Sequence, residues 1–136
     1  MNQPDCVFCA IVAANEPHHE IVWQDERHVA FLNKRPTNPD HLLVIPRAHT
    51  DYAFDLSPEA YAALMEASRK LAVPLRAFSG EKRIALAIDG FHVPHVHVHL
   101  VPVEKTGDLC SPATDPSPDE LASRGDSLRK LFAEVR

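Results

Sequence analysis

The alternation of histidine with valine in HVHVHLV, residues 95–101, constrains the fold more than any other feature of the chain. Successive side chains of a strand point to opposite faces, so His95, His97 and His99 would share one face and leave the other to the core. Neighbouring imidazoles on a strand lie about 6.6 Å apart at Cα, and the outer pair about 13 Å. Two neighbours can bind one metal ion, but three on a regular strand cannot. We therefore expect the three histidines to have different roles.

A solvated polar face is the simplest alternative explanation of this pattern. Solubility does not require imidazole, and neither Lys, Glu nor Thr interrupts the three histidines. Imidazole has an unperturbed pKa of about 6.5, so much of it is neutral at pH 7. A neutral imidazole is a nucleophile, and a protonated one can hold an anion or donate a proton. The pattern therefore favours catalysis near neutral pH.

The rest of the sequence predicts five strands and two helices. Apolar or alternating runs predict strands at 21–25, 28–33, 41–46, 83–89 and 95–101. Ser57-Pro58 and Ser117-Pro118 each pair a capping residue with a proline suited to the first helical position, so a helix is expected after each. Pro74 is expected to kink or end the first helix. Because the helices are set apart from the strands, we predict an α+β fold with a five-stranded antiparallel sheet, a long helix and a C-terminal helix.

Composition limits the class of protein. The 136 residues suit one compact domain, and the net charge of −5 argues against a nucleic-acid partner because no basic stripe is present. No signal peptide, membrane anchor or membrane partner is expected, so the predicted location is cytoplasmic. An odd number of cysteines, three, argues against a disulfide framework.

Three blocks of the sequence together resemble the histidine triad (HIT) family of nucleotide hydrolases and transferases. HVHVHLV is similar to its His-φ-His-φ-His-φ-φ signature, where φ is apolar. FLNKRPTNPDHLLVIPRAH, residues 31–49, resembles its upstream block, and CVFCAIV, residues 6–12, its N-terminal segment. The resemblance implies a HIT-like domain over residues 1–103, with 104–136 as a C-terminal linker and helix that packs on or extends the same domain.

The resemblance implies catalysis through His97, with His99 and His41 beside the phosphate. His97 would attack the α-phosphate of a purine nucleotide, and the nucleotidyl-histidine would then release a nucleoside monophosphate. Nothing in the motif requires Mg²⁺. A dinucleoside polyphosphate hydrolase, and a nucleotide-binding module with negligible turnover that zinc stabilises, remain alternatives.

The resemblance also indicates substrate-binding residues. Asn33 stands where many members carry an acidic residue that binds the ribose, although it could simply end a strand in a turn. Positions that line the base pocket in the family are occupied by apolar residues that could equally be ordinary core: Val7, Phe8, Ile11 and Phe31. Phe91 and His92 stand where the family carries Gln and Ser or Thr at the phosphate. His92 could bind phosphate or be an exposed loop residue.

Cys6 and Cys9 form a CxxC pair, which alone is a weak signal and is also explained by two buried thiols. Some members of the family carry a structural zinc, and the resemblance implies Cys6, Cys9, His49 and His95 as its ligands. The family also implies a homodimer formed through the long helix and the strand at 83–89, which would otherwise be an exposed apolar edge. Cys110 is assigned no role.

Overall fold

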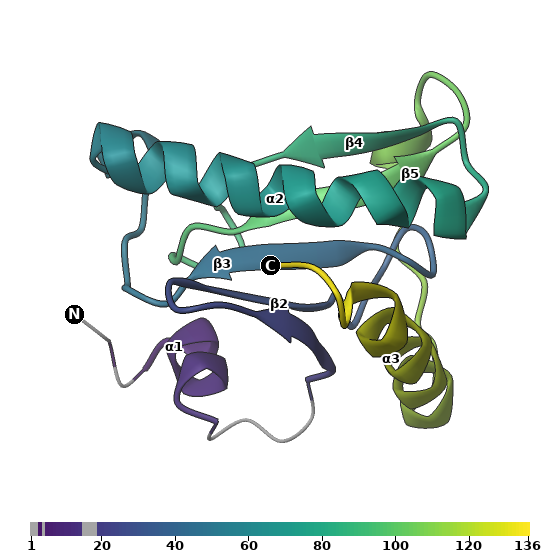
Figure 1. The fold of residues 1–136 in the computed structure, drawn as a ribbon, viewed down its shortest axis with the longest axis horizontal. Helices are drawn as coiled ribbons and strands as arrows, with labels where there is room; N and C mark the ends of the chain where they lie inside the picture. The colour runs from purple at the N-terminus through teal and green to yellow at the C-terminus, as the bar shows by residue number, and fades with distance from the viewer. Residues whose placement is uncertain (1–2, 4, 15–18) are drawn as a thin grey trace.

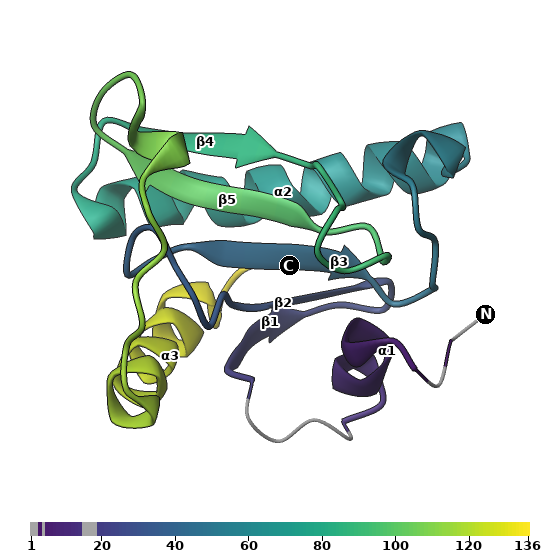
Figure 2. The same cartoon turned by 180° about the vertical axis from the view of Figure 1, so that it is seen from behind.

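The computed structural model describes residues 3, 5–14 and 19–136. Its centre is a five-stranded antiparallel sheet in the order β1-β2-β3-β5-β4 (Figure 1; β1 is labelled in Figure 2). The strands are β1 Ile21–Gln24, β2 His28–Leu32, β3 Leu42–Pro46, β4 Arg83–Ala87 and β5 Val98–Val103. The predicted α+β fold is confirmed, and the alternating side chains of the strands explain its two apolar layers.

Two hydrophobic clusters lie on opposite faces of the sheet. In β3, Leu42 and Val44 belong to the cluster under helix α2 (Pro58–Ser79), which crosses one face (Figure 1 and Figure 2). Leu43 and Ile45 belong to the cluster that includes helix α1 (Val7–Val12). Because β3 is covered on both faces, it is apolar at nearly every position, as the sequence indicates.

Helix ends follow the predicted signals. The Ser57 hydroxyl accepts a hydrogen bond from the Ala60 N–H at the start of α2. At its end, Gly80 adopts a left-handed conformation with φ +76°. Pro74 does not end the helix, which continues for five residues to Ser79. Helix α3 (Pro118–Phe132) begins with a capping box in which Ser117 and Glu120 bond each other's backbone N–H.

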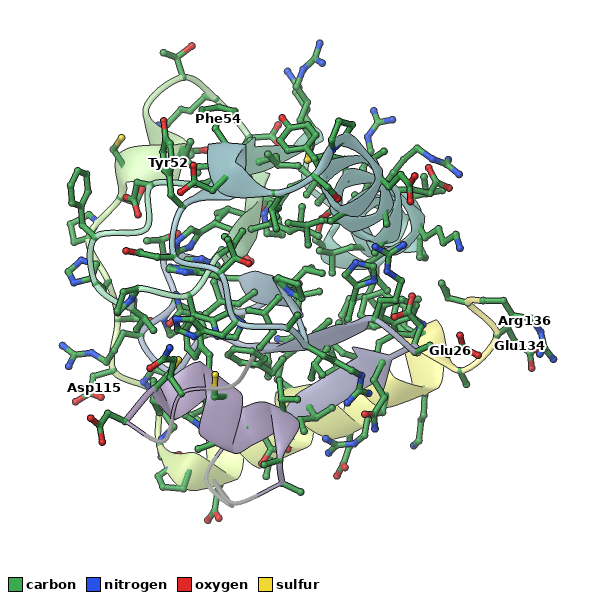
Figure 3. All side chains as sticks on the ribbon, turned by 90° about the vertical axis from the view of Figure 1, so that its left-hand side faces the viewer. Glu26, Tyr52, Phe54, Asp115, Glu134 and Arg136 are labelled. Atoms are coloured by element: carbon green, nitrogen blue, oxygen red, sulfur yellow. The ribbon has the colours of Figure 1, made fainter. Side chains whose placement is uncertain are left out.

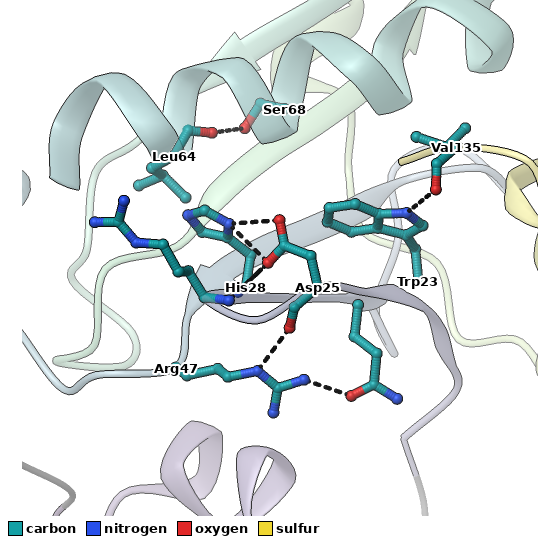
Figure 4. Close-up of polar contacts among 9 residues, drawn as sticks. Trp23, Asp25, His28, Arg47, Leu64, Ser68 and Val135 are labelled. Atoms are coloured by element: carbon teal, nitrogen blue, oxygen red, sulfur yellow. Dashed lines mark hydrogen bonds and ion pairs between the residues drawn. The ribbon is translucent and has the colours of Figure 1, made fainter. Parts of the chain in front are cut away.

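The turn between β1 and β2 is closed by Asp25 (Figure 4). Its carboxylate accepts from the Arg27 and His28 backbone N–H groups and lies 3.1 Å from His28 Nδ1. Burial alone would raise the pKa of Asp25, but these donors outweigh it and lower the pKa. The charged form of Asp25 therefore stabilises the turn that sets the register of the two strands.

The regular ladder of β5 starts later than predicted. Its first residue is Val98, so His95 and His97 precede the strand rather than lying on it. In this extended lead-in, the Val96 N–H donates to Thr50 O instead of to a neighbouring strand. Val96 still packs in the cluster under α2 while His95 contacts α1, so the predicted alternation of faces holds.

The segment 104–136 packs against the sheet. Figure 2 shows it running from the end of β5, through the short helix η2 (Asp108–Cys110), past the β2–β3 connection and into α3. Leu128 and Phe132 of α3 belong to the cluster under α2. None of the helices formed by the described residues has the length and apolar character needed to cross a membrane. Tyr52 and Phe54 lie on the surface, 56% and 71% exposed (Figure 3).

Candidate functional site

His97 presents one specific ring nitrogen to its surroundings. Its Nδ1 lies 2.7 Å from the backbone oxygen of His95, and because a carbonyl can only accept, Nδ1 must carry the proton. The other nitrogen, Nε2, therefore keeps its lone pair. The ring packs edge-on against Phe8, with 5.1 Å between centroids, and lies 5.0 Å from the His99 ring. This arrangement fixes both the tautomer and the orientation of the imidazole.

A chain of hydrogen bonds fixes the tautomers of His41 and His99. The Thr37 backbone N–H donates to His41 Nδ1 at 3.2 Å, so Nδ1 is an acceptor and Nε2 carries the proton. That Nε2 lies 2.9 Å from His99 Nδ1, which must accept. The Asn33 Nδ2 also lies 3.3 Å from His41 Nε2, but a side-chain amide can turn whereas the backbone N–H of Thr37 is fixed, so Thr37 decides the tautomer. His99 is consequently left with its proton on Nε2.

Burial keeps both of these imidazoles neutral. It lowers the pKa of His41 to about 4, with a further contribution from the neighbouring His99. It also lowers the pKa of His99, where His97 acts in the same direction and the carboxylate of Asp89 opposes it. At neutral pH this pair therefore acts through hydrogen bonds rather than through a fixed positive charge.

The histidines face a cavity of 770 Å³. Its floor follows one row across the sheet, because Phe31 pairs with Leu43, Leu43 with His99, and His99 with Ala87. One end of the row, under α1, is apolar and aromatic, since Phe8 meets Phe31 at 5.3 Å between ring centroids. The cavity therefore combines an apolar end with a set of imidazoles.

Most residues predicted to bind substrate line this cavity, namely Val7, Phe8, Phe31, Asn33 and His92. Ile11 differs, because it packs in the hydrophobic cluster that includes α1 and is not among the residues that line the cavity. Asn33 also fulfils the alternative expectation, since its Oδ1 accepts from the Arg35 N–H in a turn. Substrate binding by these residues stays a prediction.

Sequence reasoning missed several residues at the cavity: Thr37, Leu43, Asp89, Leu109, Cys110 and Ala113. The sequence indicates Leu43 only as a core residue of a strand, although it predicts that its pairing partner Phe31 lines the pocket. Cys110, assigned no role, reaches the wall because η2 folds back toward the sheet. Phe91, which stands where the family carries Gln, is 90% exposed, so its side chain points to solvent.

Four predicted metal ligands come together beside α1. Cys6 Sγ lies 3.4 Å from His95 Nδ1, and Cys9 Sγ lies 3.3 Å from His49 Nδ1 and 3.5 Å from His95 Nδ1. Ligands of one tetrahedral zinc, with bonds of about 2.3 Å to sulfur and 2.0 Å to nitrogen, are separated by about 3.5 Å. His95 Nε2 donates to Pro46 O at 2.8 Å, which leaves Nδ1 free to bind a metal. The residues present thus fit a closed zinc site.

A second group, Asp89 with His97 and His99, also brings three potential ligand atoms within 4.8 Å of one another. The hydrogen bonds of His41 leave a proton on His99 Nε2, the nitrogen that does not contact His41. A protonated ring nitrogen cannot bind a metal. This group therefore suits binding of an anion to His99 better than binding of a cation.

The comparison with known families settles the relationship. The sequence model of the HIT domain matches residues 14–106. The chain belongs to the HIT domain family. The two clusters of this HIT domain, one of thiols and imidazoles and one of imidazoles over a cavity, thus lie within or beside the matched region.

Relatives of this HIT domain cover nearly its whole length. It is 34% identical over 138 residues to an uncharacterised HIT-like protein of Mycobacterium tuberculosis, covering 95% of this chain and 94% of the relative. It is 30% identical over 130 residues to the adenosine 5'-monophosphoramidase of Schizosaccharomyces pombe, covering 90% and 95%. A zinc-bound histidine triad family protein of Mycobacterium smegmatis has a similar structure, with a TM-score of 0.80, 32% identity and coverage of 96% and 94%.

Proposed function

We propose that this HIT domain is a nucleotide phosphoramidase or hydrolase that acts at the α-phosphate through a nucleotidyl-histidine intermediate on His97. Membership of the family, with relatives named as adenosine 5'-monophosphoramidases in two yeasts, identifies the chain as an enzyme of the hydrolase class. The observation that carries the mechanism is the set of tautomers, which leaves a lone pair on His97 and a proton on His99 at one cavity.

In the proposed first step, His97 Nε2 forms a bond to the α-phosphorus, and the bond to the leaving group breaks as that group takes the electron pair and a proton from solvent. The Nδ1–H···O bond to His95 supports this step, because it holds the ring while positive charge develops on it. In the second step, water displaces His97 and the nucleoside monophosphate leaves. A buried, oriented nucleophile lowers the entropic part of both barriers.

His99 and His41 are proposed to stabilise the phosphoryl oxygens. His99 Nε2–H is the donor that faces the reacting group, and His41 holds it from behind through the 2.9 Å contact. Such donors act strongly in a site from which water is largely excluded. The exposed His92, which lines the same cavity, is proposed as an additional phosphate ligand.

The apolar end of the cavity is proposed to bind a purine base. Phe8 and Phe31, whose rings pack against each other, line this end, and Val7 adds to the wall. Asn33 lies between the apolar end of the cavity and His41, where we propose that the ribose binds. Its Nδ2 group is proposed to hydrogen-bond the ribose when substrate binds.

We propose that zinc at Cys6, Cys9, His49 and His95 is structural. All four positions are taken by protein side chains, which is typical of structural zinc rather than catalytic zinc. When bound, the ion would supply positive charge that stabilises thiolates. Burial, together with the neighbouring Cys9 thiol, raises the pKa of Cys6. The site would hold α1 against the lead-in to β5. Because His99 and His92 can donate hydrogen bonds to the charged phosphate, we propose that the enzyme does not require Mg²⁺.

A nucleotide-binding role with slow turnover is the second candidate. It is favoured by Phe91, which points to solvent and supplies no side-chain donor to the phosphate. The dinucleoside polyphosphate hydrolase is a variant of the first candidate with a different leaving group. In either case we propose a cytoplasmic homodimer without nucleic-acid or membrane partners. The edge strand β4, with Leu86 41% exposed, supports pairing with a second copy.

Turnover of adenosine 5'-phosphoramidate tests the proposal. The protein as isolated should release AMP, and denaturation during turnover should trap one nucleotidyl group on His97, detectable by mass spectrometry. His97→Ala should retain nucleotide binding and zinc but lose at least about 10³-fold in kcat. Equal AMP release by the two proteins would refute the nucleophile. Tight AMP binding without turnover would favour the second candidate.

A further inference from the structure

The segment 104–136 is tied to the loop that carries His41. Both the Thr114 N–H and its hydroxyl donate to Pro36 O at 2.8 Å. On α3, Arg124 Nη1 lies 3.1 Å from the carboxylate of Asp40. These two contacts lie on either side of Thr37, the residue whose N–H sets the tautomer of His41.

The contact of Asp40 is a buried one. Asp40 is 5% exposed, and its neighbour in sequence is His41. Burial raises the pKa of Asp40, and the positive charge of Arg124, 3.1 Å away in an ion pair, opposes that rise. A buried carboxylate that loses its cation must be protonated or move toward water. Either change would remove the attraction that holds the loop to α3 at the residue next to His41.

A third contact between the two regions is weak. Arg35 and Asp115 are 4.0 Å apart, with side chains 68% and 85% exposed, and Asp115 lies on the surface (Figure 3). Ion pairs of this kind contribute little because water screens them. The hydrogen bonds of Thr114 and the ion pair of Arg124 therefore carry the connection.

Helix α3 has an independent anchor at its other end. Arg129 Nη1 donates to Ile21 O at 2.9 Å, and its Nη2 lies 3.2 Å from the Glu20 carboxylate. Arg124 faces the loop and Arg129 faces β1, so one helix carries two arginines with different targets. Loss of either would weaken the docking of α3, but only Arg124 touches the His41 loop.

We propose that Arg124 and Thr114 are positioning residues that hold the loop 36–41 so that Thr37 fixes His41 in the tautomer that donates to His99. The C-terminal segment is then part of the catalytic arrangement rather than an appendage. Only the kinetic part of the test rests on the proposed function, because the tautomer is measured directly.

The first test compares Arg124→Met with Arg129→Met in the full chain. Two-bond ¹H–¹⁵N spectra of the histidine side chains should show Nε2-protonated His41 in the wild type and in Arg129→Met. In Arg124→Met they should show a mixture of tautomers. An unchanged His41 spectrum in Arg124→Met would overturn the proposal, whether or not the protein hydrolyses phosphoramidates.

The second test uses kinetics with adenosine 5'-phosphoramidate. Arg124→Met should lower kcat about tenfold or more, since small misplacements of catalytic groups are costly, and leave KM within about twofold. Arg129→Met should leave kcat within about twofold even if it lowers the unfolding temperature equally. Equal losses of kcat in the two variants would reduce Arg124 to a structural role and refute the proposal.

Thr114→Val supplies a variant that keeps the helix intact. Thr114 is exposed, and its N–H bond to Pro36 survives the substitution while the hydroxyl bond does not. We expect a loss of about threefold in kcat and a partial shift of the His41 tautomer. Arg124→Lys, which keeps the charge, should recover most of the loss seen with methionine. Failure of lysine to recover any activity, with no tautomer shift in Thr114→Val, would contradict the proposal.

Discussion

Two clusters divide the histidines of residues 95–99, and they differ in which ring nitrogen is left free. His95 donates from Nε2 to Pro46 O and turns Nδ1 toward the thiols of Cys6 and Cys9. His97 donates from Nδ1 to His95 O and leaves Nε2 unprotonated beside the cavity. In both cases a backbone carbonyl decides which nitrogen is available. The neighbours of that free nitrogen then decide between a closed metal site and an open reaction site.

The largest expected effect is loss of the thiol cluster. Cys6→Ser should remove about one zinc per chain and lower the free energy of unfolding by more than about 4 kcal/mol, because α1 loses its attachment. Metal analysis and urea unfolding measure the two quantities. Cys110→Ser, which changes an exposed thiol, is the matched control and should alter neither. If the wild-type protein contained no zinc and Cys6→Ser did not change the free energy of unfolding, the proposed zinc site would be refuted.

The cluster of His41, His97 and His99 at the cavity should behave in the opposite way. His41→Asn should keep the zinc but lower kcat about 10²-fold to 10³-fold, because His99 loses the partner that orients its donor. KM should change much less, since the base end of the cavity is untouched. Steady-state kinetics and metal analysis on the same sample check this. Loss of zinc in His41→Asn would show that the clusters are not independent.

The pKa of His41 predicts a specific pH dependence of stability. The folded state does not protonate His41 until the pH falls to about 4, whereas the unfolded chain does so below 6.5. The stabilising contribution is therefore complete above pH 6.5 and is lost as the pH falls toward 4, to a total of about 3 kcal/mol.

The measurement is urea unfolding from pH 7 to 4.5 for the wild type and His41→Asn. Loss of zinc at low pH affects both proteins, so the difference between them isolates His41. That difference should shrink steadily as the pH falls below 6.5. A difference that stays constant over this range would mean that His41 titrates normally in the folded protein.

The smallest expected effect concerns Phe8, which contacts both clusters. Its ring lies 6.0 Å from that of His95 and 5.1 Å from that of His97. Phe8→Leu should cost about 1 kcal/mol of stability and raise KM about threefold, since the side chain is buried and lines the cavity. The zinc content should stay at about one ion per chain. A fall in zinc content would show that a change at Phe8 alters the metal site as well as the cavity.

Much of this architecture follows from local pattern. The alternation at residues 95–101 predicted which side chains share a face, and Ser57-Pro58 and Ser117-Pro118 predicted both long helices. The family resemblance implied all four ligands of the thiol cluster, and the structure brings them together. These predictions succeed because strand periodicity and helix capping depend on a few neighbouring residues.

Other features depend on contacts between distant segments. Pro74 lies within α2 because the packing of the helix against the sheet outweighs the lost hydrogen bond. Ile11 packs in the hydrophobic cluster that includes α1, which is the alternative that the sequence left open for it. Thr37 and Cys110 join the cavity only after loops fold back on the sheet. No pattern within the loop or the C-terminal segment could indicate these neighbours.

The sequence by itself determined the sheet, its helices and the face on which the histidines lie, since a side chain's direction along a strand depends only on its position. Only the tertiary structure decided which nitrogen of each imidazole is free. That choice depends on single hydrogen-bond partners, His95 O for His97, Pro46 O for His95 and Thr37 N–H for His41. A difference of one proton position separates a metal ligand from a nucleophile, and the surrounding backbone sets it.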